Sequence, residues 1–179
     1  EMTVIVVIGD GGCGIGTAHL VHAARRNPDI TVLVANNFNF GMTGGQHSPT
    51  TPEDAFTTTT SGHHAERPFD ICQTVAVNGA AFAARCSALD THVADRIEQA
   101  IRTPGFALVD IWELCVAYYV PSNKVTPKSL VELSTRLNMP FGVIQESRLP
   151  AAPESPAPAA AKPARSKSGA PGPEGMPLP

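Results

Sequence analysis

The 179-residue chain is 42% hydrophobic, which is enough for one α/β domain with a sizeable core and no more. Its 13 basic and 16 acidic residues give a net charge of −3 and form no basic stripe, which argues against a nucleic-acid-binding protein. No apolar run is long enough to span a membrane and the first residues form no signal peptide, so the sequence predicts a cytoplasmic protein.

The first segment has the pattern of a buried strand. Residues 3–8 are an unbroken apolar run, mostly β-branched, as expected for a strand covered on both faces of a parallel sheet. Glycines flank Asp10 directly after it, and residues 14–27 are predicted to form a helix. Glycines let backbone N–H groups approach an anion closely, and a helix N-terminus favours negative charge. The pattern predicts a phosphate site at the carboxyl end of this strand.

Asp10 adds a metal ion to this prediction. A carboxylate beside a phosphate repels it unless a cation lies between them and binds both. The next predicted strand covers residues 30–35. It is followed by Asn36, Asn37 and Asn39, whose amide and main-chain oxygens suit octahedral Mg²⁺. Because one strand, helix and strand unit brings both groups to the same edge of a sheet, the residues predict a site for Mg²⁺ and a diphosphate.

Other glycine-rich sites fit the same residues less well. Gly9, Gly11 and Gly14 satisfy the dinucleotide pattern GxGxxG, but the second strand of that motif should end in an acidic residue, and here it ends in asparagine. A nucleotide P-loop needs lysine before serine or threonine, which this segment lacks. A tight glycine turn in which Asp10 only caps the helix stays open as an alternative.

The remaining elements follow a long loop, residues 38–68, that is rich in glycine, threonine, serine and proline. A loop of this length in a compact domain is usually functional or mobile. Its first half is expected to surround the cofactor that carries the predicted diphosphate. The later patterns predict a strand at 73–76, a helix at 80–86, a helix at 91–102, a strand at 106–111 and a helix at 127–137 capped by Thr126. Alternating strands and helices predict an α/β fold with a doubly wound parallel sheet.

The end of the sequence differs in composition from the rest. Residues 150–179 are rich in proline and alanine and contain almost no large apolar side chains. Such a segment cannot bury enough surface to offset the entropy of ordering the chain. We therefore predict one domain at residues 1–149 and a disordered tail at residues 150–179.

Two sequence strings link these features to a known family. The spacing between GDG and NN matches the thiamine diphosphate signature, and the longer strings GDGGCGIGTAHLVHAARRN and NNFNFGMTGGQHSPTTP are more specific. From about residue 4 to about residue 144 the chain resembles the β subunit of 2-oxoacid:ferredoxin oxidoreductases, nearest the 2-oxoglutarate type. Pyruvate enzymes of this family usually carry asparagine where Met42 stands, which favours a different 2-oxoacid. The resemblance implies a thiamine diphosphate-binding fold of the pyrophosphate-domain type.

The resemblance also implies which residues contact the cofactor. Asp10 and Asn37 would bind Mg²⁺ through their side chains, and Asn39 through its main-chain carbonyl. The implied contacts to the diphosphate and the thiazolium ring come from Gly9, Gly11, Gly12, Cys13, Gly41, Met42 and Thr43. No catalytic residue follows from the resemblance, but His47 and Thr43 are candidates for positions near the substrate.

The four cysteines form no CxxC pair, so they indicate neither a zinc site nor a redox pair. Cys13, Cys72 and Cys86 are expected to be buried thiols. By resemblance, Cys115 matches one ligand of the family's [4Fe-4S] cluster, whose other ligands lie in an upstream segment that this sequence lacks. A cluster is expected only if such a segment completes it, because one thiolate cannot hold it. The chain therefore resembles an N-terminally truncated subunit.

The resemblance finally implies a reaction and partners. Thiamine diphosphate accepts the electron pair left when a 2-oxoacid loses CO₂. With CoA and oxidised ferredoxin, the implied products are acyl-CoA, CO₂ and reduced ferredoxin, and a separate α subunit would supply the glutamate that activates the cofactor. Two alternatives stay open, namely another thiamine diphosphate-dependent enzyme such as a non-oxidative 2-oxoacid decarboxylase, and an inactive subunit fragment.

Overall fold

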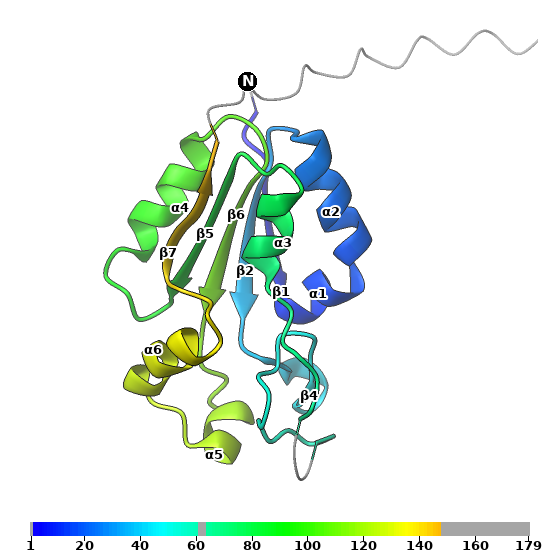
Figure 1. Cartoon of the computed structure of the whole chain (residues 1–179), viewed down its shortest axis with the longest axis vertical. Coiled ribbons are helices and arrows are strands. Elements are labelled where there is room, and N and C mark those ends of the chain that lie inside the picture. The colour runs from blue at the N-terminus through cyan, green and yellow to red at the C-terminus, as the bar shows by residue number, and fades with distance from the viewer. Residues whose placement is uncertain (1, 61–63, 148–179) are drawn as a thin grey trace, which may run out of the picture.

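The computed structural model describes residues 2–60 and 64–147, whose longer strands form one mostly parallel sheet (Figure 1). Across the sheet, the strands follow the order β1 (Ile5–Gly9), β2 (Thr31–Asn36), β6 (Ala107–Trp112), β5 (Phe82–Ser87) and β7 (Gly142–Glu146). The first four run parallel, and β7 runs antiparallel to β5. The predicted α/β class is confirmed, with one antiparallel edge strand that the sequence patterns did not predict.

Helices cover both faces of this sheet (Figure 1). They are α2 (Thr17–Arg26) and α3 (Ile71–Val77) on one face and α4 (Val93–Arg102) on the other. Val34 and Leu108 belong to the core layer under α2 and α3, while Ala84 and Val109 belong to the layer under α4. Neighbouring residues of one strand thus enter different layers, because successive side chains of a strand point to opposite faces.

A third apolar cluster lies beyond the carboxyl end of the sheet. It is covered by α5 (Tyr119–Asn123) and α6 (Pro127–Arg136) (Figure 1). The ring of Phe38 meets Trp112 edge-on at 5.0 Å between centroids and Tyr119 at 5.4 Å. Thr126 caps α6 as predicted, because its hydroxyl accepts a hydrogen bond from the Ser129 backbone N–H. This cluster fixes the segments that follow β2 and β6.

Two of the predicted elements are interchanged in the structure. Residues 73–76, predicted as a strand, belong to helix α3, and residues 80–86, predicted as a helix, belong largely to strand β5. The Asp70 carboxylate starts α3 by accepting from the Gln73 N–H at 2.8 Å, and Gly79, at φ 96°, follows its end. Strand β5 is buried on both faces, so its sequence shows no alternation of apolar and polar residues that would indicate a strand.

The first strand is also placed differently from its prediction. Residues 3–8 were expected to be covered on both faces, but within residues 2–60 and 64–147 β1 is the edge strand of the sheet and pairs only with β2. Ile5 is 45% exposed and Val7 is 70% exposed. The physical reason is position, since α4 packs mainly over β5 and β6 and leaves the outer face of β1 open within the described part of the chain.

The other predicted elements agree with the structure to within a few residues. The strands predicted at 30–35 and 106–111 are β2 and β6, and the helices predicted at 91–102 and 127–137 are α4 and α6. The helix predicted at 14–27 is α2, preceded by a short helix, α1 (Asp10–Ile15). The long loop contains β3 (Asn39–Phe40), a short 3-10 helix, η1 (Gly41–Thr43), and β4 (Gln46–His47).

The predicted disordered tail, residues 150–179, and the domain boundary before it lie outside the described residues. Among the residues that are described, no helix is both long and apolar enough to cross a membrane. The described part therefore consists of the sheet, its covering helices and the loops that extend from the carboxyl ends of the strands (Figure 1).

Candidate cofactor site

The two predicted halves of the site meet at the carboxyl ends of the parallel strands β1 and β2. Strands β1 and β2 are parallel neighbours in which Gly9 lies opposite Ala35, so the segments that follow them leave the sheet side by side. Between these segments is a pocket of about 280 Å³, which we call the cofactor pocket. It is lined by Gly9, Asp10, Gly11, Gly12, Ile15, Asn37, Asn39, Phe40, Gly41, Met42 and Thr43. The structure therefore brings together most of the residues predicted to contact the cofactor.

Close packing explains why glycine occurs beside the pocket. A Cβ atom added to Gly11 would collide with the ring of Phe40, and one added to Gly14 would collide with Pro49. Gly9, rather than Asp10, occupies the N-cap position of α1, so the alternative in which Asp10 only caps a helix is not what the structure shows. The glycines let the chain after β1 pack directly against the loop that follows β2.

Asp10 lies at the inner wall of the pocket and is only 2% exposed. Its carboxylate accepts hydrogen bonds from the hydroxyls of Ser48 and Thr50, the second at 2.9 Å. Burial raises the pKa of Asp10 above its ordinary value, and this outweighs the opposite effect of the hydrogen bonds. A bound cation would stabilise the ionised carboxylate, so a metal ion would relieve the cost of burying it.

The two asparagines of the site have different environments. The Asn37 side-chain oxygen accepts from the Asn39 N–H at 3.3 Å, which closes a tight turn after β2. The Asn39 side chain is 3% exposed, and neither atom of its amide makes a well-formed hydrogen bond among the described residues, although the amide lies near enough to Cys115 to help lower the pKa of that thiol. Unpartnered buried polar atoms are rare in proteins and often mark an ion or water site. Asp10 and these amides offer the hard oxygen donors that Mg²⁺ requires, so they fit the ion.

The apolar wall of the pocket is formed by two side chains that are open to solvent. Ile15 is 87% exposed and Met42 is fully exposed. Thr43, predicted to lie near the substrate, stands on the same wall, where its hydroxyl donates to Gln46 Oε1 at 2.7 Å. Exposed apolar side chains around a polar floor are typical of a site that binds a partly apolar ligand.

His47 does not line this pocket, although strand β4 places it opposite the pocket residue Asn39. His47 follows in β4, its Nδ1 lies 2.9 Å from the Thr59 hydroxyl, and its ring is 5.2 Å from the ring of His64. It is not among the residues that line the cofactor pocket. Of the two candidates for a position near the substrate, only Thr43 therefore lies at the pocket itself.

The cysteines fall into two groups. Cys13, Cys72 and Cys86 are buried as expected, and burial raises the pKa of Cys13 to about 12 and that of Cys86 to about 11. Cys13 therefore directs its side chain into the core, which leaves its backbone for the predicted cofactor contact. Cys115 is half-buried next to Gly41, and its sulfur would be 3.7 Å from a Cβ atom there.

The surroundings of Cys115 lower the pKa of its thiol, but the described residues provide no group of further metal ligands. Burial alone would raise its pKa, but backbone N–H groups of Tyr119 and Tyr118 outweigh this effect and lower it. Among residues 2–60 and 64–147, no group of three or more histidines, cysteines or acidic residues is arranged to hold a metal ion. Cluster binding through Cys115 thus stays a prediction that depends on additional ligands.

The sequence patterns did not predict the buried residues that contact Asp10 or lie behind these contacts in the sheet. Ser48 and Thr50 contact Asp10 from the long loop. Behind them, Asp110 on β6 and Arg85 on β5 form a buried ion pair, with 3.1 Å between Arg85 Nε and Asp110 Oδ2. The signal available in the sequence was a charged residue within each apolar strand, because a charge at such a position must be paired.

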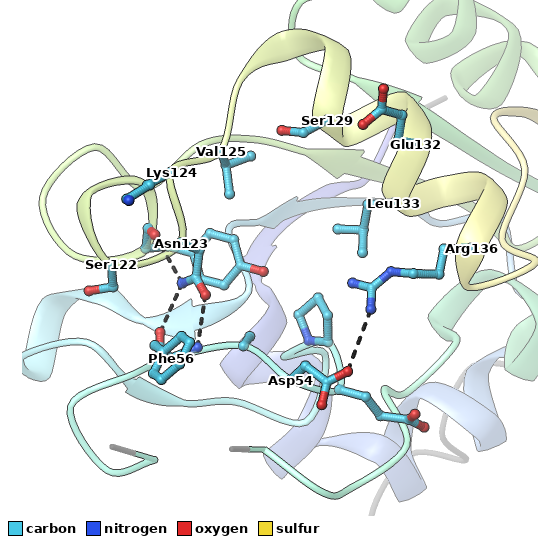
Figure 2. Close-up of a pocket in the computed structure, with 14 residues that line it drawn as sticks. Asp54, Phe56, Ser122, Asn123, Lys124, Val125, Ser129, Glu132, Leu133 and Arg136 are labelled. Carbon is cyan, nitrogen blue, oxygen red and sulfur yellow. Dashed lines mark hydrogen bonds and ion pairs between the residues drawn. The ribbon is translucent and has the colours of Figure 1, made fainter. Parts of the chain in front are cut away.

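A second cavity, of about 560 Å³, lies between the long loop and helices α5 and α6 (Figure 2). Its walls include Asp54 and Arg136, which face each other across it at 3.9 Å, and Asn123, which is bonded to the Phe56 backbone. None of the residues predicted to contact the cofactor lines this cavity. We therefore place the candidate site at the smaller pocket.

A family model matches more than half of the chain. Residues 1–111 match the family described as thiamine pyrophosphate enzyme, C-terminal TPP binding domain. The matched range contains every residue that lines the cofactor pocket. It ends in β6, so it includes four of the five strands of the main sheet.

Curated relatives match over a longer range. The chain is 39% identical to 2-oxoglutarate synthase subunit KorB of Methanothermobacter marburgensis over 135 residues, which are 74% of this chain and 47% of the relative. It is 37% identical to the 2-oxoacid:ferredoxin oxidoreductase subunit beta of Saccharolobus solfataricus over 120 residues, which are 66% of this chain and 39% of the relative. The chain thus spans about half the length, or less, of these relatives.

A solved structure shares the fold. The 2-oxoglutarate:ferredoxin oxidoreductase from Magnetococcus marinus, which has 2-oxoglutarate, coenzyme A and succinyl-CoA bound, superposes with a TM-score of 0.62. The match covers 82% of this chain and 58% of that chain at 23% sequence identity. At this identity the likeness concerns the fold alone.

Proposed function

This chain belongs to the family of thiamine pyrophosphate enzymes, as a C-terminal TPP binding domain, and on that premise we propose that its cofactor pocket holds thiamine diphosphate together with Mg²⁺. The observation that carries the proposal is the meeting of Asp10 with Asn37 and Asn39 at one edge of the sheet, beside glycines that allow close backbone approach. Fold resemblance alone would not locate a site, so the proposal is supported by this group of residues and not by the fold.

Each part of the pocket has a role in this proposal. Mg²⁺ would be held by the carboxylate of Asp10, the side-chain oxygen of Asn37 and the main-chain carbonyl of Asn39. Backbone N–H groups at the start of α1, where Gly11 and Gly12 lie, would bind the diphosphate. When bound, thiamine diphosphate supplies an electron sink for the decarboxylation of a 2-oxoacid.

The apolar and exposed residues would bind the remainder of the cofactor. Met42 and Ile15 would pack against its rings and exclude water from them, which strengthens the electrostatic interactions inside the site. Thr43 would stand at the substrate side, with Gly41 allowing the loop to approach the cofactor. In this arrangement the chain binds and orients the cofactor, and its described residues provide no general base at the pocket.

We further propose that the chain serves as the cofactor-binding part of the β subunit of a 2-oxoacid:ferredoxin oxidoreductase acting on 2-oxoglutarate or a related acid. The names of the relatives support this activity. An α subunit, ferredoxin and CoA would then be its partners in converting the 2-oxoacid to acyl-CoA and CO₂. A [4Fe-4S] cluster would use Cys115 only together with ligands from elsewhere.

Cofactor binding tests the first proposal. We expect calorimetric titration of the 179-residue chain with Mg²⁺ and thiamine diphosphate to show binding. Asp10→Ala should weaken this binding by more than about 100-fold, because losing a direct metal ligand costs more affinity than losing a residue that only orients a ligand. Asp95→Ala, which removes an exposed carboxylate from α4, is the matched control and should bind as the wild-type chain does. Equal affinity of Asp10→Ala and wild type would contradict the proposal.

Reconstitution tests the activity. The chain, combined with an α subunit of a close relative and with ferredoxin, is expected to reduce ferredoxin when 2-oxoglutarate and CoA are both present. Release of CO₂ without ferredoxin or CoA would indicate a non-oxidative decarboxylase instead. Cofactor binding without any turnover in the assembled complex would indicate a subunit that lacks activity.

A further inference from the structure

A continuous series of buried polar contacts runs from Asp10 into the sheet. The Thr50 hydroxyl lies 2.9 Å from Asp10 Oδ2 and 2.9 Å from Asn36 Oδ1, so it contacts both side chains, and its single proton is donated to one of these oxygens at a time. The Asn36 amide donates to Asp110 Oδ1 at 3.0 Å. All four residues are almost completely buried. These contacts connect the cofactor pocket with the centre of the sheet without passing through solvent.

Asp110 is itself held from two further directions. Arg85 donates from Nε to Asp110 Oδ2 at 3.1 Å, and its terminal nitrogen pairs with Asp70 at the start of α3. The indole nitrogen of Trp112 donates to the same Asp110 oxygen at 2.9 Å. Burying these charges carries a desolvation cost, and removing one partner would leave the other charge buried and unpaired, so the pair holds Asp110 in one arrangement.

The charge of Asp110 determines the orientation of the Asn36 amide. A carboxylate only accepts hydrogen bonds, so the NH₂ group of Asn36 must face Asp110 and its carbonyl must face Thr50. A flipped amide would place two oxygens against each other in a buried environment. The same carbonyl accepts from the Phe38 N–H at 3.3 Å, within the turn that carries the predicted metal ligands. One amide orientation thus fixes both Thr50 and this turn.

The hydroxyl contacts in turn fix the carboxylate of Asp10. Ser48 and Thr50 both contact Oδ2, so the carboxylate cannot rotate without breaking both contacts. A metal ligand that is held in this way loses less conformational freedom when the ion binds.

We propose that the buried Arg85–Asp110 pair positions Asp10 for cofactor binding through Asn36 and Thr50, and that occupancy of the pocket is transmitted along these contacts to Trp112. The proposal rests on the proposed function, since it names residues that support the same pocket. Arg85, Asp110, Asn36 and Thr50 are positioning residues, because they act on the cofactor only through Asp10 and the turn after β2.

Trp112 provides a reporter for this arrangement. It is the one tryptophan of the sequence, so its indole N–H gives a single cross-peak in a ¹H–¹⁵N spectrum. The indole donates directly to Asp110 and does not line the cofactor pocket. We expect saturation with Mg²⁺ and thiamine diphosphate to shift this cross-peak in the wild-type chain.

The decisive variants change Thr50. Thr50→Val keeps the shape of the side chain but removes the hydroxyl that joins Asp10 to Asn36, whereas Thr50→Ser keeps the hydroxyl. We expect Thr50→Val to weaken binding of Mg²⁺ and thiamine diphosphate by about 10- to 100-fold and to abolish the ligand-induced shift of Trp112, and we expect Thr50→Ser to restore both.

Two further variants separate positioning from general stability. Asp110→Asn removes the charge that orients Asn36, and it should weaken binding by a similar factor. Val109→Ala removes packing from the same strand on its opposite face, so it should lower the melting temperature but leave affinity within about twofold. If Asp110→Asn fails to fold, the Thr50 pair decides the question alone.

The outcomes distinguish this proposal from the proposed function. If the wild-type chain binds no cofactor, the proposed function fails, and the spectrum of the free chain still tests the contacts. In that spectrum Thr50→Val should displace the Trp112 cross-peak, and Thr103→Val, at the end of α4, should not. The proposal is overturned if Thr50→Val binds as wild type does, if the ligand-induced shift of Trp112 persists in it, or if its free-chain spectrum is unchanged. Persistence would assign the shift to the Phe38–Trp112 ring contact instead.

Discussion

At the scale of single residues, Asp10 combines a negative charge with almost complete burial. Its hydroxyl partners satisfy hydrogen bonds but supply no positive charge, which explains why burial raises its pKa. In the chain without cofactor, a carboxyl group in this state favours folding when protonated. The stability that it contributes is present below its unfolded pKa and is lost as pH rises through its raised folded pKa.

A neutral substitution at this position should therefore stabilise the chain while removing its function. We expect Asp10→Asn to raise the free energy of unfolding of the cofactor-free chain at pH 7, and the difference from wild type to shrink as pH falls through the folded pKa of Asp10. Urea unfolding of both proteins in EDTA at several pH values measures it. Asp95→Asn, on the surface of α4, should show no such trend, and a destabilised Asp10→Asn would contradict the expectation.

Residue patterns near one another in sequence could predict the pocket, and distant contacts could not. Asp10, Asn37 and the glycines lie in two short strings, so the carboxyl ends of parallel strands bring them together by topology alone. Asp110 and Arg85 are far from both strings, and only the pairing of β2, β6 and β5 places them under the pocket. No local pattern contains that information.

At the scale of elements, the intrinsic propensities of the residues in α3 and β5 favour other structures than those that capping and tertiary packing produce. An aspartate cap and the glycine after the helix fix α3 over residues that include valine and threonine, which alone would favour a strand. The alanines of β5 would favour a helix, but the segment pairs with β6 on one side and β7 on the other and is buried between the apolar layers under α3 and α4. Tertiary packing therefore overrides propensity at both elements.

Helix α5 is tied to the long loop by one side chain. The Asn123 side-chain oxygen accepts from the Phe56 N–H at 2.8 Å, and its NH₂ group donates to the Phe56 carbonyl at 2.9 Å (Figure 2). The loop carries Ser48 and Thr50 a few residues earlier, so this contact helps to restrain the segment that supports the pocket.

We expect Asn123→Ala to lower the free energy of unfolding by about 0.5 to 1.5 kcal/mol, because it removes hydrogen bonds to exposed backbone groups of Phe56 that water can then satisfy. Limited proteolysis should cut the loop near Phe56 faster than in wild type. Ser122→Ala, a neighbouring exposed position, is the control, and equal cleavage of the two variants would argue against a role of Asn123 in holding the loop.

At the scale of the whole molecule, the sheet has unequal edges. Strand β7 ends it on one side as an antiparallel strand, and on the other side β1, which carries exposed apolar side chains, has no further strand beside it among the described residues. An open apolar strand edge favours association with other chains. The unequal edges follow from topology, which composition and periodicity do not specify.

We expect the 179-residue chain to self-associate at high concentration, and Val7→Lys to reduce this association, because charged side chains at a strand edge oppose pairing. Light scattering at increasing concentration measures the effect. The substitution is at an exposed position, so it should change the free energy of unfolding by only about 0.5 kcal/mol. Val77→Lys, exposed on the end of α3, is the control, and an equal effect of both would assign the association to general surface charge.

The reversed direction of β7 also has a practical consequence. The four parallel strands end on the side of the sheet where the cofactor pocket lies. Strand β7 instead starts on that side and ends beside Phe82, where β5 begins (Figure 1). Strand β1 likewise begins at that remote end. A tether attached through residue 147, for example to an electrode or a bead, would therefore hold the molecule by the end opposite its pocket and leave the pocket facing the solution.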